Sequence, residues 1–205
     1  PEPHSGTAPL VSYYRAHLCS LMDDKRAATA HLIAAAKASP DYCFPARLEE
    51  MAILEHALTL RPRDARAAFY LGNLLYDRRR HREAIALWKR AVQFEPRNAV
   101  AWRNLGIGAF NVLGQPALAR RAYEAAFRAN PSDARLLYER DQLWKRLGVA
   151  PATRLRELER HPSLVAQRDD LTVEFCALLN QSGQAGRALP IIAARKFQPW
   201  EGGEG

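Results

Sequence analysis

An internal repeat in the middle of the chain constrains the fold more than any other feature. Residues 65–98 align with residues 99–133. A Leu-Gly pair recurs 34 positions later and a proline recurs 35 positions later, so the second unit carries one extra residue. Each unit holds two helical patterns of about a dozen residues that are separated by a turn. A helical hairpin repeated at this period predicts a solenoid, in which each repeat stacks on its neighbours.

The residue types within each unit suit a pair of packed helices. Small residues stand where the two helices must approach closely, and large aromatic residues can fill the space between units. A proline ends the second helix of each unit, and Asp or Asn precedes each first helix as an N-cap. The small residues are Gly72, Ala84, Gly106 and Ala119, the aromatic residues are Trp88, Trp102 and Tyr123, the prolines are Pro96 and Pro131, and the N-caps are Asp64, Asn98 and Asp133.

These positions carry a known sequence signature. Trp102, Leu105 and Gly106 reproduce the W-x2-L-G start of the tetratricopeptide repeat (TPR), and the earlier unit carries the Leu-Gly, A-x3-aromatic and Pro parts. The chain therefore resembles TPR proteins. The resemblance implies an all-α fold, an α-solenoid of antiparallel helix pairs (TPR superhelix), and the helical patterns predict about 11 helices.

Fainter copies extend the pattern on both sides, so we expect residues 1–205 to form a single TPR-like solenoid. Turn glycines keep the period at Gly114, Gly148 and Gly183. The expected parts are an N-terminal divergent repeat (9–40), an extra unpaired helix (45–61), two TPRs (65–98 and 99–133), a degenerate TPR (134–162), a C-terminal TPR-like pair (163–197) and a Gly-rich tail (198–205).

Three local departures from the pattern need separate expectations. In the degenerate repeat, Arg140-Asp141 replaces the Leu-Gly pair. We expect one long helix over residues 163–182, and we expect Pro190 either to kink the last helix or to delay its start. We expect Trp200 in the tail to cover the last helix pair as a hydrophobic plug.

Several segments together resemble a narrower family. They are SPDYCFPARLE (39–49), AFYLGNLLYDRRRHREAIALWKRAV (68–92), AWRNLGIGAFN (101–111), RLLYERDQLWKRLG (135–148), RDDLTVE (168–174) and FQPWEGGEG (197–205). The set is similar to the repeat region of large bacterial proteins, many of them actinobacterial, in which TPRs follow an N-terminal, mutarotase-like domain of unknown function. The resemblance implies that the chain is a fragment of a larger bacterial protein.

Motifs of common catalytic sites are missing from the sequence. There is no GxSxG, P-loop or HExxH motif, and the histidines lack metal-ligand spacing. Adjacent acids such as Asp169-Asp170 suit the start of a helix, where they favour its dipole. We therefore expect a non-enzymatic protein with no catalytic residues, no cofactor and no bound metal.

Cysteines, hydropathy and charge suggest where the chain resides. Cys19, Cys43 and Cys176 are odd in number and far apart, which favours free thiols in a reducing compartment. The sequence has no signal segment and no apolar run of about 18 residues, so we expect a cytoplasmic chain and no membrane. The net charge is +8, but the dense basic run at residues 78–82 suits a turn between helices.

In TPR proteins the first helix of each repeat lines a concave groove. The groove-facing positions of this chain carry aromatic and Arg side chains with little Lys, which is typical of protein-binding surfaces. The alternative for Phe69, Tyr76 and Phe110 is packing against neighbouring helices. The candidate groove residues are Tyr13, His17, Arg66, Phe69, Asn73, Tyr76, Arg103, Asn104, Ile107, Phe110, Arg135, Tyr138 and Gln142.

One subclass of TPR grips a C-terminal carboxylate with two Lys, two Asn and an Arg. Asn73 and Asn104 stand at the two Asn places, and Arg135 replaces one Lys. Phe69 and Glu139 stand where the other Lys and the Arg belong, and an acid there would repel a carboxylate. We do not expect a carboxylate clamp.

The sequence as a whole suggests a non-catalytic protein–protein interaction or scaffolding module. Its partner would be a protein or peptide segment, or another domain of the same parent protein, bound in the groove. Two alternatives stay open. One is an accessory domain that completes a carbohydrate-active enzyme, and the other is an Arg-rich nucleic-acid-binding module whose affinity would fall steeply with salt.

Overall fold

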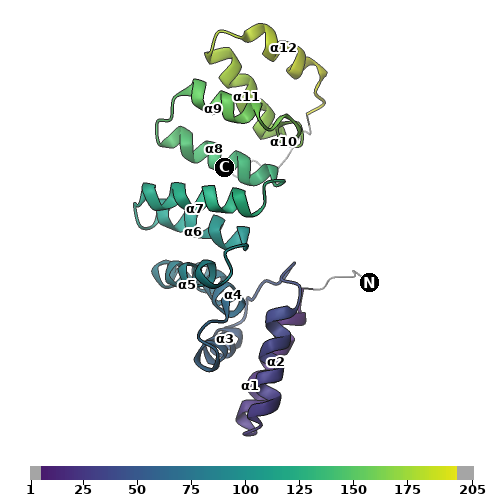
Figure 1. The fold of residues 1–205 in the computed structure, drawn as a ribbon, viewed down its shortest axis with the longest axis vertical. Helices are drawn as coiled ribbons and strands as arrows, with labels where there is room; N and C mark the ends of the chain where they lie inside the picture. Colours follow the sequence, from purple (N-terminus) through teal and green to yellow (C-terminus); the bar gives the residue numbers. More distant parts are fainter. Residues whose placement is uncertain (1–5, 198–205) are drawn as a thin grey trace. The chain divides into compact units, whose positions relative to one another are not determined.

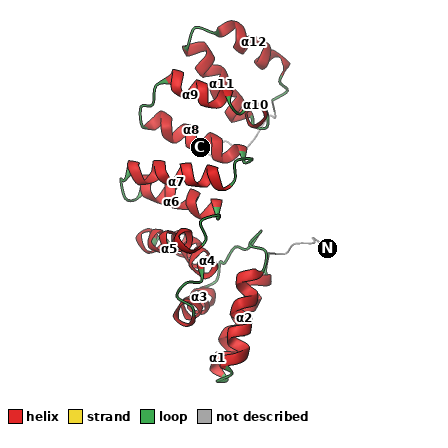
Figure 2. Cartoon of the chain, in the orientation of Figure 1, coloured by secondary structure: helices red, strands yellow, loops and turns green. Residues whose placement is uncertain are grey.

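A computed structural model describes residues 6–197, which form twelve helices and no strand (Figures 1 and 2). The expectation of an all-α fold is confirmed for this part of the chain. One compact unit ends at Ala122 and a second begins at Tyr123, so the division falls inside a helix. The expected tail, including Trp200, lies outside the described residues.

The first unit consists of helix hairpins and one intervening helix. Its helices are α1 (Ala8–Leu21), α2 (Lys25–Lys37), α3 (Leu48–Leu60), α4 (Ala65–Asp77), α5 (His81–Phe94), α6 (Ala99–Asn111) and the first half of α7 (Pro116–Ala129). α1 packs on α2, and α4 packs on α5. The helix without a sequence partner, α3, lies against α1 and α4 and joins the same apolar core.

The ends of the helices follow the sequence signals. Asp64, Asn98 and Asp133 each accept a hydrogen bond from a backbone N–H two or three residues later, at 2.9 to 3.0 Å. These three N-cap predictions are confirmed. α5 and α7 each end two residues before a proline, as expected for a residue that cannot continue a helix.

The turns within the hairpins share a left-handed residue. Gly114, Gly148 and Gly183 have φ values of 60°, 71° and 73°. The turn between α4 and α5 uses Arg79 for the same purpose, at φ 62°. A side chain is strained in this conformation, because its Cβ approaches the following carbonyl. The turn between α4 and α5 therefore stores strain that the three glycine turns avoid.

A glycine sets the distance between α4 and α5. A Cβ added to Gly72 would lie 2.6 Å from Nε1 of Trp88, which is closer than van der Waals contact allows. Trp88 is only 3% exposed, so its ring has little room to shift. The expectation that small residues permit close approach of paired helices is confirmed at this position.

The second unit starts within α7 and holds five more helices. They are α8 (Ala134–Arg146), α9 (Pro151–Glu159), α10 (Pro162–Val165), α11 (Asp169–Gln181) and α12 (Ala185–Ala194). The expected single helix over residues 163–182 is wrong, because α10 and α11 are separate. Arg168 adopts extended backbone (φ −129°, ψ 137°), and Asp169-Asp170 then open a new helix with acids in its first turn.

The last helix is held mainly by arginines. Ala188 is its one buried residue, while Leu189 and Ile192 are exposed. Arg187 pairs with Glu159 of α9 at 2.9 Å, and Arg195, just past the helix end, pairs with Asp169 of α11. Pro190 lies inside a helix that already begins at Ala185, so the expected later start is wrong.

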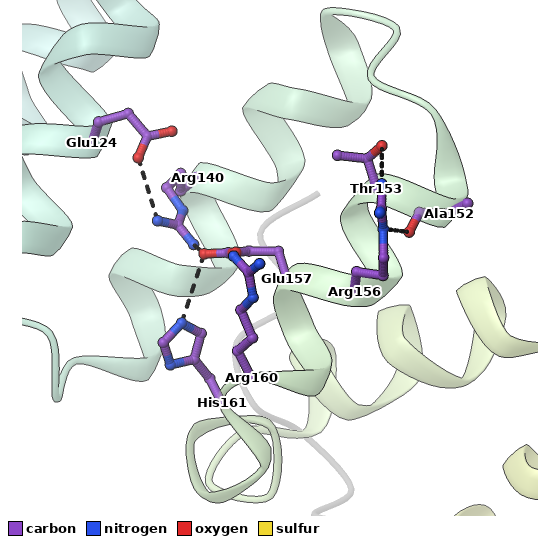
Figure 3. Close-up of polar contacts among 8 residues, drawn as sticks. All are labelled: Glu124, Arg140, Ala152, Thr153, Arg156, Glu157, Arg160 and His161. Carbon is purple, nitrogen blue, oxygen red and sulfur yellow. Dashed lines mark hydrogen bonds and ion pairs between the residues drawn. The ribbon is translucent and has the colours of Figure 1, made fainter.

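Buried charges replace the Leu-Gly pair in α8. The side chain of Arg140 is 5% exposed and contacts Glu124 of α7 at 3.4 Å and Glu157 of α9 at 2.5 Å (Figure 3). Glu157 also lies 3.6 Å from Nε2 of His161. Burial alone would raise the pKa of Glu157, but the charge and hydrogen bond of Arg140 outweigh it and lower that pKa.

Asp141 has its own buried partner. Arg154 of α9 donates to Asp141 at 2.9 and 2.5 Å and to Glu174 of α11 at 2.6 Å. Burial raises the pKa of Asp141 despite this arginine. Burial opposes ionisation of Glu174 as well, but hydrogen bonds from Arg154 and Lys145 lower its pKa. Ion pairs therefore link α8 to α7 and α9, and α9 to α11, whereas Gly72 at the equivalent place in α4 makes a close contact with Trp88.

Candidate functional site

The first unit contains an open groove of about 830 Å³ between α4, α6 and the segment that joins α2 to α3. Residues of α4 and α6, here called the floor, line it together with residues 40–44 of the joining segment, here called the wall. Seven of the candidate residues lie together here, namely Arg66, Phe69, Asn73, Tyr76, Arg103, Asn104 and Ile107. The groove therefore gathers candidates from two adjacent repeats.

Two asparagines on the floor hold each other in a fixed orientation. Nε1 of Trp88 donates to Oδ1 of Asn73 at 3.0 Å, and Nδ2 of Asn104 donates to the same oxygen at 3.0 Å. An indole nitrogen can only donate, so this oxygen must be the acceptor. The amide of Asn73 keeps its two N–H donors, and Asn104 keeps its carbonyl oxygen. A donor and an acceptor are thus left side by side for a ligand.

Arg66, one of the arginines that line the groove, already pairs with an acid. Nε of Arg66 donates to both carboxylate oxygens of Glu95, at 3.1 and 2.8 Å. Burial alone would lower the pKa of Arg66, but the hydrogen bond and charge of Glu95 outweigh it and raise that pKa. A paired arginine is poorly suited to gripping a free carboxylate.

The aromatic candidates differ in what they offer to a ligand. Phe69 is 6% exposed and packs against Tyr70, with ring centroids 5.6 Å apart, so the packing alternative holds for most of its surface. Tyr76 is half-buried, and its ring lies 5.1 Å from that of Trp88 and 4.4 Å from that of His81. On α6, Val100 adds exposed apolar surface to the groove, since it is 51% exposed.

Three candidates of the first unit lie outside this groove. Tyr13 is 1% exposed, and its hydroxyl donates to Asp64 at 3.0 Å, so it belongs to the core. Burial and the charge of Asp64 raise the pKa of Tyr13 well above its usual range. His17 packs edge-on against His56 of α3, with centroids 4.9 Å apart. Phe110 is half-buried and is not among the lining residues.

The remaining candidates lie on α8 in the second unit. Arg135 is exposed and donates to Glu139 at 2.8 Å, while Tyr138 and Gln142 are half-buried. Burial raises the pKa of Tyr138. Glu139, which stands at the expected Arg place of a carboxylate clamp, also accepts a hydrogen bond from the hydroxyl of Tyr123 at 3.3 Å. Arg135 and Glu139, which stand at two places of the clamp pattern, therefore bind each other.

Sequence reasoning missed the wall of the groove that precedes α3. Pro40, Asp41, Tyr42, Cys43 and Phe44 all line it. The signal was present as two aromatic residues between two prolines in an otherwise helical chain. Its place depends on contacts distant in sequence, which no local pattern encodes.

Two further kinds of site were considered for residues 6–197, namely a reactive thiol and a metal-binding cluster. Burial raises the pKa of Cys43 to about 11, so its thiol stays protonated at neutral pH. Within residues 6–197 no group of three or more His, Cys, Asp or Glu is placed to hold a metal ion. In the same range no helix is long and apolar enough to cross a membrane.

The second unit has a smaller hollow of about 610 Å³ beside α12. Leu158, Val165, Phe175 and Ile191 line it, and Arg187 and Arg195 stand at its rim. Both arginines are in the ion pairs that hold α12. The polar groups at this rim are therefore already used to fix the helix.

Comparison with known proteins agrees with the helical hairpins. Residues 65–98, which contain α4 and α5, match the family model of the tetratricopeptide repeat. A crystal structure of MamA superposes with a TM-score of 0.59 at 15% identity, covering 92% of this chain and 90% of that one. YrrB, described as a TPR protein with an unusual peptide-binding site, gives a TM-score of 0.56 at 18% identity and covers 89% and 81%. PilF of Pseudomonas aeruginosa gives 0.54 at 18% identity and covers 90% and 88%. The chain therefore has the α-solenoid fold of TPR proteins.

Proposed function

We propose that the chain is a non-catalytic interaction module that binds an extended peptide segment in the groove of the first unit. The observation that carries the proposal is the pair Asn73 and Asn104. Their open N–H donor and carbonyl acceptor match the C=O and N–H of a peptide backbone, and any extended segment presents both. The fold supports the same function, since TPR domains bind proteins and peptides.

The proposal also concerns the protein from which the bound segment comes. It belongs either to a separate protein or to another domain of a larger bacterial parent protein. A cytoplasmic location is part of the proposal too, and it is supported by three cysteines that are all free in the structure. Phe69 and Glu139 at two cation places, and the bond between Arg135 and Glu139, argue against a carboxylate clamp, so an internal segment of the partner fits as well as a chain end.

Nucleic-acid binding through the basic run is the weaker alternative. Nη2 of Arg78 donates to the carbonyl of Ala46 at 2.5 Å, and Arg80 forms two hydrogen bonds with Glu83, at 2.6 and 2.8 Å. These arginines fix the turn and the segment before α3. Retention on an oligonucleotide column that falls steeply with salt would nevertheless revive this alternative.

The test is selection from a phage library of random 12-residue peptides on the immobilised chain. The variant Asn73→Asp keeps an oxygen for Trp88 and Asn104 but loses the two donors that face the groove. The matched control is Asn111→Asp, an exposed position outside the groove with the same change of charge. We expect peptides that bind the wild type and the control but not Asn73→Asp. Selected peptides that bind all three equally would refute the groove.

A further inference from the structure

The segment between α2 and α3, residues 38–47, forms a wall that the repeat pattern does not supply. It runs from the end of α2 to the start of α3 (Figure 1). Five of its residues line the groove, together with the candidates of α4 and α6. The repeat pattern does not predict this wall, because it comes from the residues between two helices rather than from a repeat.

The segment is fixed at both ends by arginines. Nη1 of Arg66 lies 3.5 Å from the carbonyl of Ala38, and Nη2 of Arg78 donates to the carbonyl of Ala46 at 2.5 Å. Arg66 lies in α4 and Arg78 directly follows the end of this helix. The segment and the floor therefore keep their relative positions.

Its middle is fixed by burial and by a close backbone approach. Cys43 is 3% exposed and belongs to the apolar core, and its N–H donates to the carbonyl of Pro40 at 3.2 Å. A Cβ added to Gly6 would lie 1.9 Å from the carbonyl oxygen of Tyr42, so only glycine allows the chain to pass there. Tyr42 itself is held at φ 56°. An ordered backbone on both sides of Cys43 follows from these contacts.

This rigid wall presents two aromatic side chains to solvent. Tyr42 is 69% exposed and Phe44 is 76% exposed, and both line the groove on either side of the buried Cys43. Mobile segments can hide such rings by collapsing onto the surface, but a fixed backbone cannot. Exposed aromatic surface on a fixed support is typical of sites that receive a partner's side chain.

We propose that Tyr42 and Phe44 select the bound segment by receiving one large apolar side chain, while its main chain lies on Asn73 and Asn104. The inference rests on the proposed function of the groove. The occupant is an extended, weakly charged segment, because the groove is lined by equal numbers of acids (Asp41, Asp77 and Glu95) and arginines (Arg66, Arg97 and Arg103). Specificity then comes from the aromatic wall and affinity for any backbone comes from the asparagines.

The experiment uses the peptides selected above, synthesised with a fluorescent label, and the full chain. We expect the sequences to share one aromatic or large aliphatic position. Tyr42→Ser and Phe44→Ser should each raise the Kd about tenfold, as loss of a central aromatic contact does. Both side chains are exposed, so these variants keep the fold. The control is Leu48→Ser, a neighbouring apolar residue that is 68% exposed and does not line the groove, and its Kd should stay within about twofold of wild type.

A double-mutant cycle ties the contact to the peptide. Replacing the shared apolar residue of the peptide by Ala should weaken binding to wild type, but it should cost little more in Phe44→Ser or Tyr42→Ser. Peptides that lose binding in Asn73→Asp yet bind Phe44→Ser and Tyr42→Ser with wild-type affinity would overturn this inference and leave the groove intact. Peptides indifferent to all three variants, or a library without any enrichment, would overturn both proposals.

Discussion

Removing the cation from the buried pair of the second unit should destabilise that unit strongly. The variant is Arg154→Met, which keeps the length and apolar stem of the side chain but leaves Asp141 and Glu174 without their shared donor. The side chain of Asp141 is 3% exposed, so water cannot replace the arginine, whereas Glu174 keeps Lys145 at 3.0 Å. Breaking a buried pair from one side costs about 3–5 kcal/mol.

The cost should depend on pH in a defined direction. Burial already raises the pKa of Asp141 with Arg154 present, and removal of the cation raises it further. A group whose pKa is higher in the folded than in the unfolded state favours folding below its unfolded pKa, and that contribution is lost as pH rises through the folded pKa. The penalty of Arg154→Met is therefore smaller at pH 5, where Asp141 can take up a proton, than at pH 8.

A second variant separates lost charge from lost packing. Arg154→Met/Asp141→Leu removes both members, and an apolar replacement of a buried ion pair is often close to neutral. Hydrogen exchange read by mass spectrometry reports the stability of α8, α9 and α11, and the amides of α4 and α5 in the first unit serve as an internal reference. A double variant that loses as much protection as the single one, or a penalty that grows toward pH 5, would refute the reasoning.

Three further predictions concern local features of the fold. Gly72→Ala should lower the free energy of unfolding by about 1–3 kcal/mol because its Cβ meets Trp88, and urea titration would show this against Gly186→Ala, where a Cβ meets open space. Arg79→Gly should relieve the strain at φ 62° and raise the melting temperature by a few degrees, corresponding to about 0.5–1 kcal/mol, and an unchanged or lower value would contradict it. About 1 M salt should speed amide exchange in α12, which is held mainly by arginine ion pairs, and leave α11 unchanged.

Local sequence signals predicted the helices well because they act within a few residues. The N-caps at Asp64 and Asn98 satisfy N–H groups three residues away, and the turn glycines need only their own φ. The long helix expected over residues 163–182 failed for a local reason. The acidic pair Asp169-Asp170 suits the start of a helix, and this local signal rather than the apolar pattern on both sides decides where α11 begins.

The part of the groove that lies on α4 and α6 could be predicted from the sequence, whereas the segment before α3 could not. Positions on α4 and α6 followed from the repeat, because repeat registers place equivalent residues on equivalent faces. Tyr13 lies in the core because its hydroxyl meets Asp64, 51 residues away, and the segment before α3 became a wall because of Arg66 and Arg78. Such contacts arise only once helices are placed in space, so no window of sequence contains them.

Helical repeats are often treated as interchangeable modules, since each one touches only its neighbours. Because of the charges buried in α8, the helices of the second unit cannot be exchanged in this way. Arg140 requires an acid on the helix before and another on the helix after, and Asp141 requires the arginine of α9. A copied or transplanted hairpin would bring these charges against apolar neighbours, so the order of helices from α7 to α11 is encoded in the side chains themselves. Insertion or deletion of a hairpin between α7 and α11 would leave a buried charge without its partner, and this cost opposes such changes here.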